Sequence, residues 1–186
     1  MKNVIVIYGG PRRSFNTELL LDKFLEGFVK DEVAVEKVIL KELNIIPCTS
    51  CYGCSKDGRC IIRDDMTEIY SKLKAADIIV LASPIYFGNV TAITKSLIDR
   101  CQAFWSCKYI AKKHEQVVKK TGVFVATAGS KDKDAFTCSE YTVKLFFDAC
   151  DANFSHTLYA GETDSLPVHK NSEVLEKAFK LGRSIA

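Results

Sequence analysis

The stretch Val4-Ile-Val-Ile-Tyr8, followed by Gly9-Gly-Pro-Arg-Arg-Ser-Phe-Asn-Thr17, decides the fold. An unbroken run of β-branched residues is typical of a strand that is buried on both faces of a parallel sheet. Two glycines and a proline then end the strand, and Ser14, Asn16 and Thr17 offer capping side chains for the helix that follows. The sequence therefore predicts a strand that passes through a short polar loop into a helix.

This first loop is a candidate phosphate site. The first backbone N–H groups of a helix lack intrahelical acceptors, and the helix dipole adds partial positive charge beside them. The loop has neither the G-x-G-x-x-G pattern of a dinucleotide site nor the G-K-[ST] of a P-loop, so a single terminal phosphate, as on a mononucleotide, suits it. An ordinary strand–helix turn with a capping threonine is the alternative. The candidate binding residues are Gly10, Pro11, Arg12, Ser14, Asn16 and Thr17.

Strand-like and helix-like segments alternate along the rest of the chain. This alternation implies an α/β fold, a doubly wound five-stranded parallel sheet with helices on both faces. Sheets of this kind bind ligands beyond the carboxyl ends of the strands, where the winding reverses. Further strands are predicted at 33–40, 77–82, 122–127 and 154–159, and helices at 18–28, 66–73, 91–104, 137–150 and 172–185.

Two more loops at the same edge of the sheet are candidates for ligand binding. After the third predicted strand, Pro84 is expected to prevent the strand from continuing, and Tyr86 and Phe87 offer aromatic surface to a flat ring. After the fourth, small residues allow a ligand to approach the backbone closely. The candidate residues are Ser83, Pro84, Ile85, Tyr86, Phe87, Gly88 and Asn89 in one loop, and Thr127, Ala128 and Gly129 in the other.

A cysteine-rich loop at 47–60 follows the second predicted strand. Its pattern, C-x2-C-x2-C-x5-C, places Cys48, Cys51, Cys54 and Cys60 close enough to point their sulfurs at one centre. An iron–sulfur cluster favours four thiolates at short spacing, whereas a structural zinc usually has two well-separated pairs. A metal-free loop or an adventitious disulfide is the third interpretation. The spacing favours the cluster and leaves the other two open.

Composition limits the class of protein. The 186 residues, 47% of them hydrophobic, suffice for one buried core, so we expect a single domain over 1–186. The net charge of +3 comes from interspersed charges, which predicts no nucleic-acid partner and no membrane partner. The amino terminus is too short in its apolar run for a signal peptide, so a cytoplasmic location is expected. In that reducing setting, cysteines serve as ligands more often than as disulfide partners.

Taken together, these stretches resemble the flavodoxin-like NADPH-dependent FMN reductase family, and the cysteine loop is similar to that of its iron–sulfur flavoprotein branch. The resemblance covers nearly the whole chain. This chain differs from the family at Gly10, because the family's first loop usually reads Gly-Ser-Pro-Arg and this chain has glycine in place of that serine. The motifs that carry the resemblance are 9–17, 47–60, Asp64-Asp-Met66, 83–87, Lys95-Ser-Leu-Ile-Asp-Arg100 and Thr127-Ala-Gly129.

The resemblance implies a strand order of 2-1-3-4-5 and bound FMN, with its phosphate on the first loop and its isoalloxazine between 84–87 and 128–129. It also implies a 4Fe-4S cluster on the four cysteines, with NAD(P)H as a possible electron donor. A flavin accepts a hydride as an electron pair and can release the electrons singly, so a cluster in an adjacent loop would convert two-electron into one-electron transfer. No catalytic side chain is required.

Two functions therefore stay open at this point. One is an iron–sulfur flavoprotein that exchanges electrons with a redox protein, for which a ferredoxin-type partner is possible, or with a small molecule. The other is a clusterless NAD(P)H-dependent FMN reductase that reduces quinones or similar acceptors, its cysteine loop being structural or zinc-bound. In both cases we expect a homodimer or homotetramer, in which Phe104 and Trp105 of one subunit cover the flavin edge of another.

Overall fold

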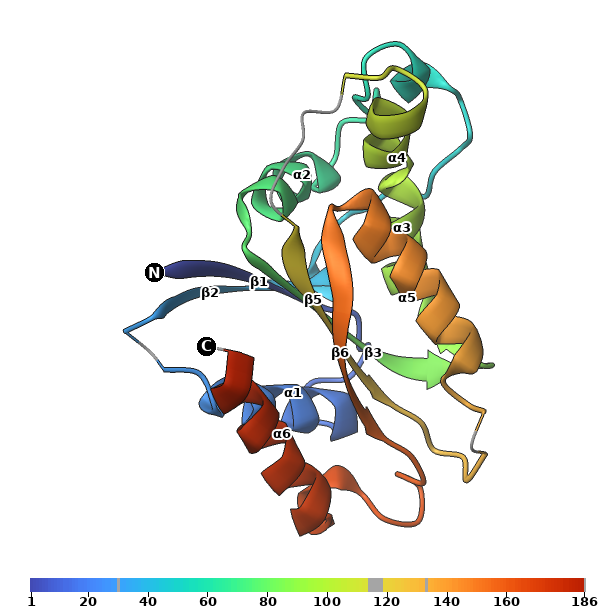
Figure 1. The fold of residues 1–186 in the computed structure, drawn as a ribbon. Coiled ribbons are helices and arrows are strands. Elements are labelled where there is room, and N and C mark those ends of the chain that lie inside the picture. Colours follow the sequence, from blue (N-terminus) through green and yellow to red (C-terminus); the bar gives the residue numbers. More distant parts are fainter. Residues whose placement is uncertain (30, 114–118, 133, 186) are drawn as a thin grey trace.

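A parallel sheet forms the centre of the protein, seen here in a computed structural model that describes residues 1–29, 31–113, 119–132 and 134–185. Every pairing between neighbouring long strands is parallel, and β1 and β3 lie inside the sheet (Figure 1). The five strands predicted from sequence are present, and their predicted order 2-1-3-4-5 is confirmed. In spatial order they are β2 (Val33–Ile39), β1 (Lys2–Tyr8), β3 (Ile78–Tyr86), β5 (Lys120–Thr127) and β6 (Ala152–Ala160).

Helices cover both faces of the sheet, because the central strands bury both of their faces. Val4, Val6 and Tyr8 of β1 pack against α1 (Asn16–Glu26) and α6 (Ser172–Ile185). Ile5 and Ile7 point to the other core, against the remaining helices. These are α2 (Met66–Ala75), α3 (Ala92–Arg100), α4 (Gln102–Tyr109) and α5 (Thr137–Ala149). The described residues also include short 3₁₀ turns, η1 (Leu40–Glu42), η2 (Gly53–Ser55) and η3 (Val168–Lys170).

The third strand is longer than the sequence predicts, and the expectation that Pro84 ends it is wrong. β1 ends at Tyr8, opposite Ala82, so β3 has a free edge beyond that residue. A proline fits at a free edge because its missing N–H breaks no ladder hydrogen bond there. On its other side β3 stays paired with β5 as far as Pro84 and Thr127.

A short unpredicted strand, β4 (Asn89–Val90), pairs antiparallel with the end of β3. The two-residue turn between them is made by Phe87 and Gly88, which both have positive φ, at 50° and 75°. Positive φ at both positions is what a tight hairpin turn requires, and Gly88 adopts it without strain.

The single helix predicted at 91–104 is two helices, α3 and α4, joined at Cys101. The N–H of Cys101 is shared between the carbonyls of Leu97 and Ile98, as is common where a helix ends. None of the helices in the described ranges is long and apolar enough to cross a membrane.

A buried ion pair ties the cysteine loop to this framework. Arg100, at the end of α3, is 1% exposed, and its Nη1 lies 2.6 Å from Oδ2 of Asp64, which is equally buried. Asp64 also accepts hydrogen bonds from the N–H groups of Ile46, at 2.8 Å, and of Met66, at 3.1 Å. Burial alone would raise the pKa of Asp64, but the hydrogen bonds from Arg100 and Ile46 outweigh it and hold the pKa below its ordinary value of 3.8.

We predict that Asp64→Asn lowers the free energy of unfolding by about 3 kcal/mol at pH 7, because it leaves the Arg100 charge buried without a counter-ion. A carboxylate whose pKa is lower in the folded state stabilises the protein above its unfolded pKa, and this contribution is lost as the pH falls through the folded pKa. The difference between native protein and variant should therefore be full at pH 7 and shrink below about pH 4. Urea denaturation at several pH values measures both effects.

The matched control is Asp99→Asn, which removes an acid from the exposed pair of Lys95 and Asp99 on the outside of α3. Exposed pairs of this kind contribute about 0.3–0.5 kcal/mol. Equal losses of stability in the two variants would show that the buried pair has no special role.

Candidate functional site

A cavity of about 320 Å³ lies at the carboxyl edge of the sheet, where the three candidate loops predicted from sequence come together. Its volume is at the lower end of the range for small-molecule sites. The segments that meet there come from the loop after β1, the end of β3, the loop after β5 and the loop after β6. The lining residues are Tyr8, Gly10, Pro11, Arg12, Phe15, Asn16, Thr17, Pro84, Ile85, Tyr86, Thr127, Gly129, Ser130, Thr163 and Asp164.

The first loop is shaped by Tyr8, which sequence analysis assigned only to the strand. Its side chain is buried, and its hydroxyl donates a 2.5 Å hydrogen bond to the carbonyl of Arg12. Burial and the nearby charge of Glu18 raise the pKa of Tyr8 to about 12, so the phenol stays protonated as a donor. A Cβ atom on Gly10 would collide with the Tyr8 ring. The glycine that replaces the family's usual serine is therefore the residue that leaves room for this phenol.

A buried carboxylate lies at the start of α1, close to the candidate phosphate loop. Glu18 accepts a 2.6 Å hydrogen bond from the backbone N–H of Ser14, and it pairs with Arg13 at 2.9 Å and Lys37 at 3.0 Å. Burial disfavours its charge, but the three partners outweigh that effect and lower the pKa of Glu18. The N–H of Ser14 is thus used inside the protein, and Arg12 is the loop arginine that lines the cavity.

The predicted residues Asn16 and Thr17 both line the cavity and also make internal hydrogen bonds. Oδ1 of Asn16 accepts from the N–H of Val168, which attaches η3 to the start of α1. The hydroxyl of Thr17 lies 2.6 Å from that of Thr127, and both side chains are buried. This pair joins the first loop to the end of β5 at the floor of the cavity, and no local sequence signal indicates it.

Only part of the second loop lines the cavity, and its other residues contact the surrounding framework or lie exposed to solvent. Pro84, Ile85 and Tyr86 line the cavity, and Tyr86 is 43% exposed, so its ring is open to a ligand. Ser83 is fully buried, and its hydroxyl accepts from the N–H of Thr91 at the start of α3. Phe87 lies fully exposed at the hairpin turn. Six residues that were predicted from sequence to bind the ligand do not line the cavity as the structure describes it: Ser14, Ser83, Phe87, Gly88, Asn89 and Ala128.

The third loop and the loop after β6 close the cavity from the other side. Ala128 is buried, and its carbonyl accepts hydrogen bonds from the N–H and the hydroxyl of Thr163. A Cβ atom on Gly129 would collide with the carboxylate of Asp164, so glycine allows the two loops to touch. Tyr8, Phe15, Ser130, Thr163 and Asp164 are the lining residues that sequence analysis missed.

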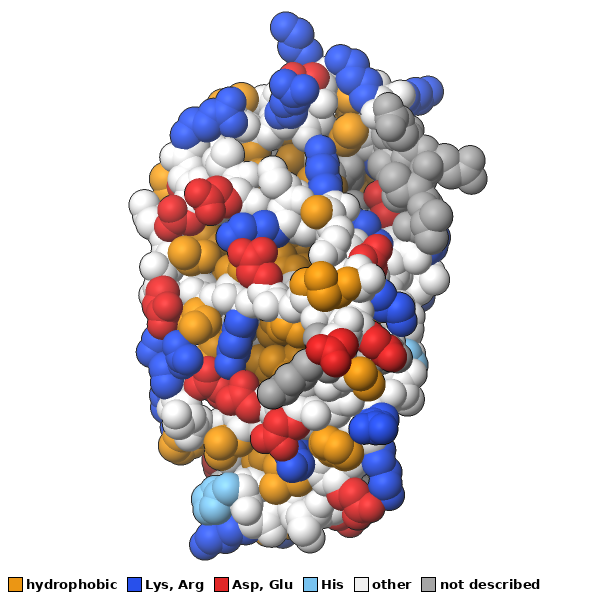
Figure 2. All heavy atoms as spheres, turned by 90° about the vertical axis from the view of Figure 1, so that its left-hand side faces the viewer, with side chains coloured by type: hydrophobic (Ala, Val, Ile, Leu, Met, Phe, Trp, Pro, Cys, Tyr) orange, Lys and Arg blue, Asp and Glu red, His pale blue; other side chains and the backbone are white. Residues whose placement is uncertain are grey.

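The cysteine loop is open in this structure. All four cysteines carry free thiols; Cys48 and Cys51 are exposed, and Cys54 and Cys60 are partly buried. Within the described ranges no three metal-ligating side chains come close enough to hold a metal ion. The sequence predicts that the four sulfurs point at one centre, and in this structure they do not converge. Figure 2 shows Lys and Arg side chains at the end of the molecule that carries this loop. The loop contributes the exposed Lys56 and Arg59, and the exposed Arg63 follows it in the sequence.

Helix α4 holds the loop from one side. The hydroxyl of Ser106 donates a 3.1 Å hydrogen bond to the carbonyl of Cys54. Gly58, with φ of 75°, packs against Cys107 so closely that a Cβ atom there would collide with it. Of the two aromatic residues expected to cover the flavin edge of a neighbour, Phe104 packs edge-on against Tyr70 of its own chain, and Trp105 is 40% exposed.

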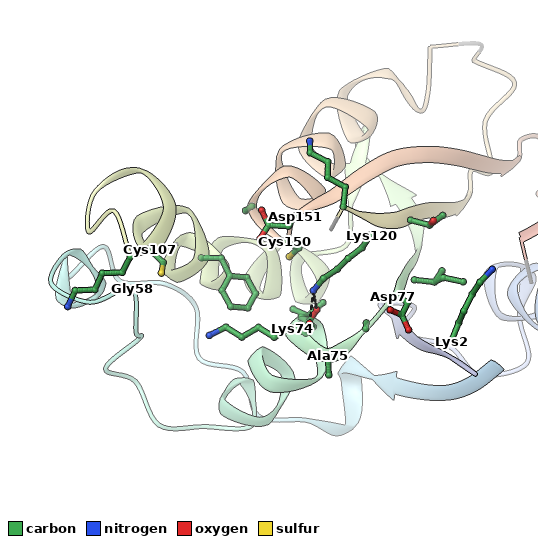
Figure 3. A pocket seen from close by; sticks show the side chains of 17 residues that line it. Lys2, Gly58, Lys74, Ala75, Asp77, Cys107, Lys120, Cys150 and Asp151 are labelled. Carbon is green, nitrogen blue, oxygen red and sulfur yellow. Dashed lines mark hydrogen bonds between the residues drawn. The ribbon is translucent and has the colours of Figure 1, made fainter. Parts of the chain in front are cut away.

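A second cavity, of about 770 Å³, lies at the amino edge of the sheet and reaches the cysteine loop at Gly58 and helix α4 at Cys107 (Figure 3). Lys120 crosses it, and its ammonium donates to the carbonyls of Leu73 and Lys74 at the end of α2. None of the described residues lines both cavities. The cysteine loop and the carboxyl-edge cavity thus lie at different ends of the sheet within one chain.

Comparison with known families gives a match over most of the chain. The sequence profile of the NADPH-dependent FMN reductase family matches residues 2–158. An iron–sulfur flavoprotein of Methanocaldococcus jannaschii is 42% identical over 97 residues, which are 52% of this chain and 50% of that protein. An iron–sulfur flavoprotein of Methanosarcina thermophila is 32% identical over 126 residues, which are 68% of this chain and 63% of that protein. The chain thus matches about half to two thirds of the length of these relatives.

Solved structures agree on the fold. The NAD(P)H:quinone oxidoreductase from Methanothermobacter marburgensis superposes with a TM-score of 0.72, covering 98% of this chain and 96% of that one, at 15% identity. At this low identity the likeness shows the flavodoxin-like arrangement of the sheet and helices, as the sequence resemblance predicted.

The floor of the cavity provides a test by mutation. We predict that Thr17→Val and Thr127→Val each lower the free energy of unfolding by about 1–2 kcal/mol, because each leaves the other buried hydroxyl without its partner. The double variant should lose clearly less than the sum of the two, since neither hydroxyl then remains unpaired. Urea denaturation of the four proteins completes the cycle, and strictly additive losses would contradict the coupling.

Proposed function

Because the chain belongs to the NADPH-dependent FMN reductase family, we propose that it is an FMN-dependent flavin oxidoreductase of the iron–sulfur flavoprotein type. In this proposal electrons pass between FMN and a redox partner, with a 4Fe-4S cluster on Cys48, Cys51, Cys54 and Cys60. The observation that carries the flavin part is the cavity at the carboxyl edge, into which three separately predicted loops bring Thr17, Tyr86 and Gly129. Cavities at this edge are the usual ligand sites of doubly wound sheets.

The residues of the cavity fit FMN. The first turn of α1 presents N–H groups without intrahelical acceptors, and Arg12 adds a positive charge beside them, as a phosphate requires. Tyr86 offers an open aromatic ring and Gly129 an unobstructed backbone, as a flat ring system requires. Bound FMN would supply hydride and electron transfer. The chain's own residues bind and orient it, and the phenol of Tyr8 keeps the first loop in shape.

The donor set of the cysteine loop fits an iron–sulfur centre. Four free thiols lie within thirteen residues, and the loop contains three left-handed backbone positions, at Ser50, Tyr52 and Gly58, that let it turn sharply. A buried donor, Nε of Arg100, lacks an acceptor in the described part of the chain beside this loop. Resemblance to two iron–sulfur flavoproteins supports the same assignment.

The remaining parts of the proposal concern partners. NAD(P)H is the proposed electron donor. The proposed acceptor is a small molecule or a redox protein such as one of the ferredoxin type, and the proposed location is the cytoplasm. We also propose a homodimer or homotetramer. Trp105 and Tyr109 on α4, and Tyr141 and Leu145 on α5, support this by leaving large apolar side chains exposed.

The open arrangement of the thiols favours one competing function. Because no metal-ligating group is assembled within the described ranges, a clusterless NAD(P)H-dependent FMN reductase that acts on quinones or similar acceptors is the alternative. In that case the cysteine loop is a structural element of the surface, or holds zinc.

The flavin proposal predicts a phosphate-dependent loss of affinity in the Asn16→Ala/Thr17→Ala double variant. FMN should bind at least about tenfold more weakly, because a hydrogen bond to a charged group contributes about 1.5–3 kcal/mol. Riboflavin, which lacks the phosphate, should lose much less. Titration of the apoprotein by flavin fluorescence measures both affinities.

Asn171→Ala serves as the control, because it removes a side chain that caps α6 through the N–H of Val174, away from the cavity. FMN should bind to it as to native protein. Unchanged FMN affinity in the double variant would place the phosphate elsewhere, and an equal loss for FMN and riboflavin would attribute the effect to cavity shape.

For the cysteine loop, anaerobic reconstitution with iron and sulfide should load about four of each per chain in native protein, and Cys51→Ala should lose most of both. Oxidation of an exposed centre frees the thiols, so the experiment excludes air throughout. Iron and acid-labile sulfide assays give the result. Uptake of zinc without stoichiometric iron and sulfide, or full loading of Cys51→Ala, would favour the clusterless reductase.

A further inference from the structure

Within the described part of the chain, the carboxyl-edge cavity is lined by two charged side chains, Arg12 and Asp164. The guanidinium of Arg12 stacks on the ring of Phe15, at 3.8 Å from the ring centre. Among the described residues, the carboxylate of Asp164 forms no hydrogen bond and no ion pair. It is exposed, so water solvates it until a ligand covers it. The cavity therefore holds a negative charge that is open to whatever binds there.

The position of Asp164 is fixed by contacts between the loop after β6 and the loop after β5. Thr163 is buried and donates both its N–H and its hydroxyl to the carbonyl of Ala128, at 3.0 and 3.1 Å. The N–H of Glu162 donates to the carbonyl of Ser130 at 2.9 Å. The backbone that leads into Asp164 is thus attached to the loop that lines the cavity, and the carboxylate has a defined place.

The absence of a side chain at Gly129 brings this carboxylate to the cavity. A Cβ atom on Gly129 would collide with both oxygens and with the carboxyl carbon of Asp164. The carboxylate therefore lies directly against the backbone of Gly129. In the proposed function, this is the stretch of backbone beside which the isoalloxazine of FMN lies.

We propose that Asp164 lowers the reduction potential of the bound flavin, because its carboxylate lies beside the isoalloxazine. This inference rests on the proposed function, in which FMN occupies the cavity with its ring at 128–129. A hydride from NAD(P)H brings two electrons and one proton to the ring, so the reduced ring carries one more negative charge than the oxidised ring. A fixed carboxylate repels that charge, and the repulsion strengthens where the ring displaces water.

The alternative is that Asp164 serves only its own turn. The N–H groups of Ser165 and Leu166 both donate to the carbonyl of Glu162, so the segment turns tightly, and aspartate is common in turns. Asparagine suits a turn as well as aspartate does. Asp164→Asn therefore removes the charge while keeping the size and the turn preference of the side chain, and the flavin potential distinguishes the two roles.

The test compares native protein, Asp164→Asn and the matched control Glu162→Gln. Glu162 is an exposed acid of the same turn that pairs with Lys131 at 3.7 Å and does not line the cavity. Each protein is loaded with FMN, and an anaerobic reductive titration followed by flavin absorbance gives the midpoint potential. We expect the flavin of Asp164→Asn to be roughly tenfold easier to reduce, which is about 30 mV for a two-electron couple. Glu162→Gln should match native protein.

A second variant, Asp164→Leu, removes the charge together with the polar atoms, and its potential should rise as in Asp164→Asn. Binding measurements then locate the carboxylate along the ligand. Oxidised FMN and riboflavin should each bind Asp164→Asn much as they bind native protein, because the oxidised ring is neutral and an exposed carboxylate is screened from the phosphate on the first loop. Titration of the apoproteins by flavin fluorescence gives these affinities.

Equal potentials in native protein and Asp164→Asn, with FMN bound to both, overturn the inference and leave the flavin function intact. A rise in Asp164→Leu alone would assign the effect to polarity or shape, and an equal rise in Glu162→Gln would assign it to net charge; either result overturns the inference. A clear gain in affinity for FMN without one for riboflavin would place the carboxylate beside the phosphate and overturn it too. If native apoprotein binds no FMN, the proposed function itself fails, and the inference fails with it.

Discussion

The ion pair between Asp64 and Arg100 is the interaction through which the cysteine loop, α2 and α3 are placed relative to one another. Both side chains are buried, so each charge requires the other, and breaking a buried pair costs far more than breaking a surface pair. Asp64 adds hydrogen bonds to the N–H groups of Ile46 and Met66, and Arg100 adds one to the carbonyl of Ile46. A pair of apolar residues could fill the same volume, but it could not satisfy these backbone groups. The specificity of the arrangement therefore comes from the polar partners.

The order of the strands separates the two candidate sites. With β1 and β3 side by side inside the sheet, the loops after β1, β3 and β5 meet at one edge and form the smaller cavity. The cysteine loop starts at the same edge, after β2, but it packs against α4 through Cys54 and Gly58, and Gly58 lines the amino-edge cavity. The loop is thus adjacent in sequence to the loops that line the smaller cavity, whereas its residue Gly58 lies at the opposite edge of the sheet. Under the proposed function, electrons that pass between the two sites of one chain would have to cross the body of the domain.

Sequence alone predicted the sheet because its signals are local. Each central strand is an apolar run that both faces bury, and this pattern survives in any neighbourhood. The sequence-based predictions failed where the local structure depends on contacts between residues that are far apart in the chain. Pro84 is tolerated in β3 because β1 stops at Tyr8, and the Thr17–Thr127 contact joins residues 110 positions apart. The contact between the Tyr8 ring and Gly10 likewise depends on the orientation of the tyrosine side chain, which the hydrophobic pattern of a strand does not specify. The loops were predictable as a set, and their individual contacts were not.

The two sites also differ in how much of their structure exists before a ligand binds. The carboxyl-edge cavity is built on strand ends and buried hydroxyls, so its residues are already ordered by the core. The cysteine loop instead has Cys48 and Cys51 exposed, and its thiols do not converge among the described residues. Closing a loop costs conformational entropy that metal binding has to offset, and this cost grows with the length left free. Because Arg100 already joins Ile46 to Asp64, only the residues between these two points remain to be arranged. Under the proposed function, the buried guanidinium would therefore contribute to metal affinity by removing part of the loop closure from the work of binding.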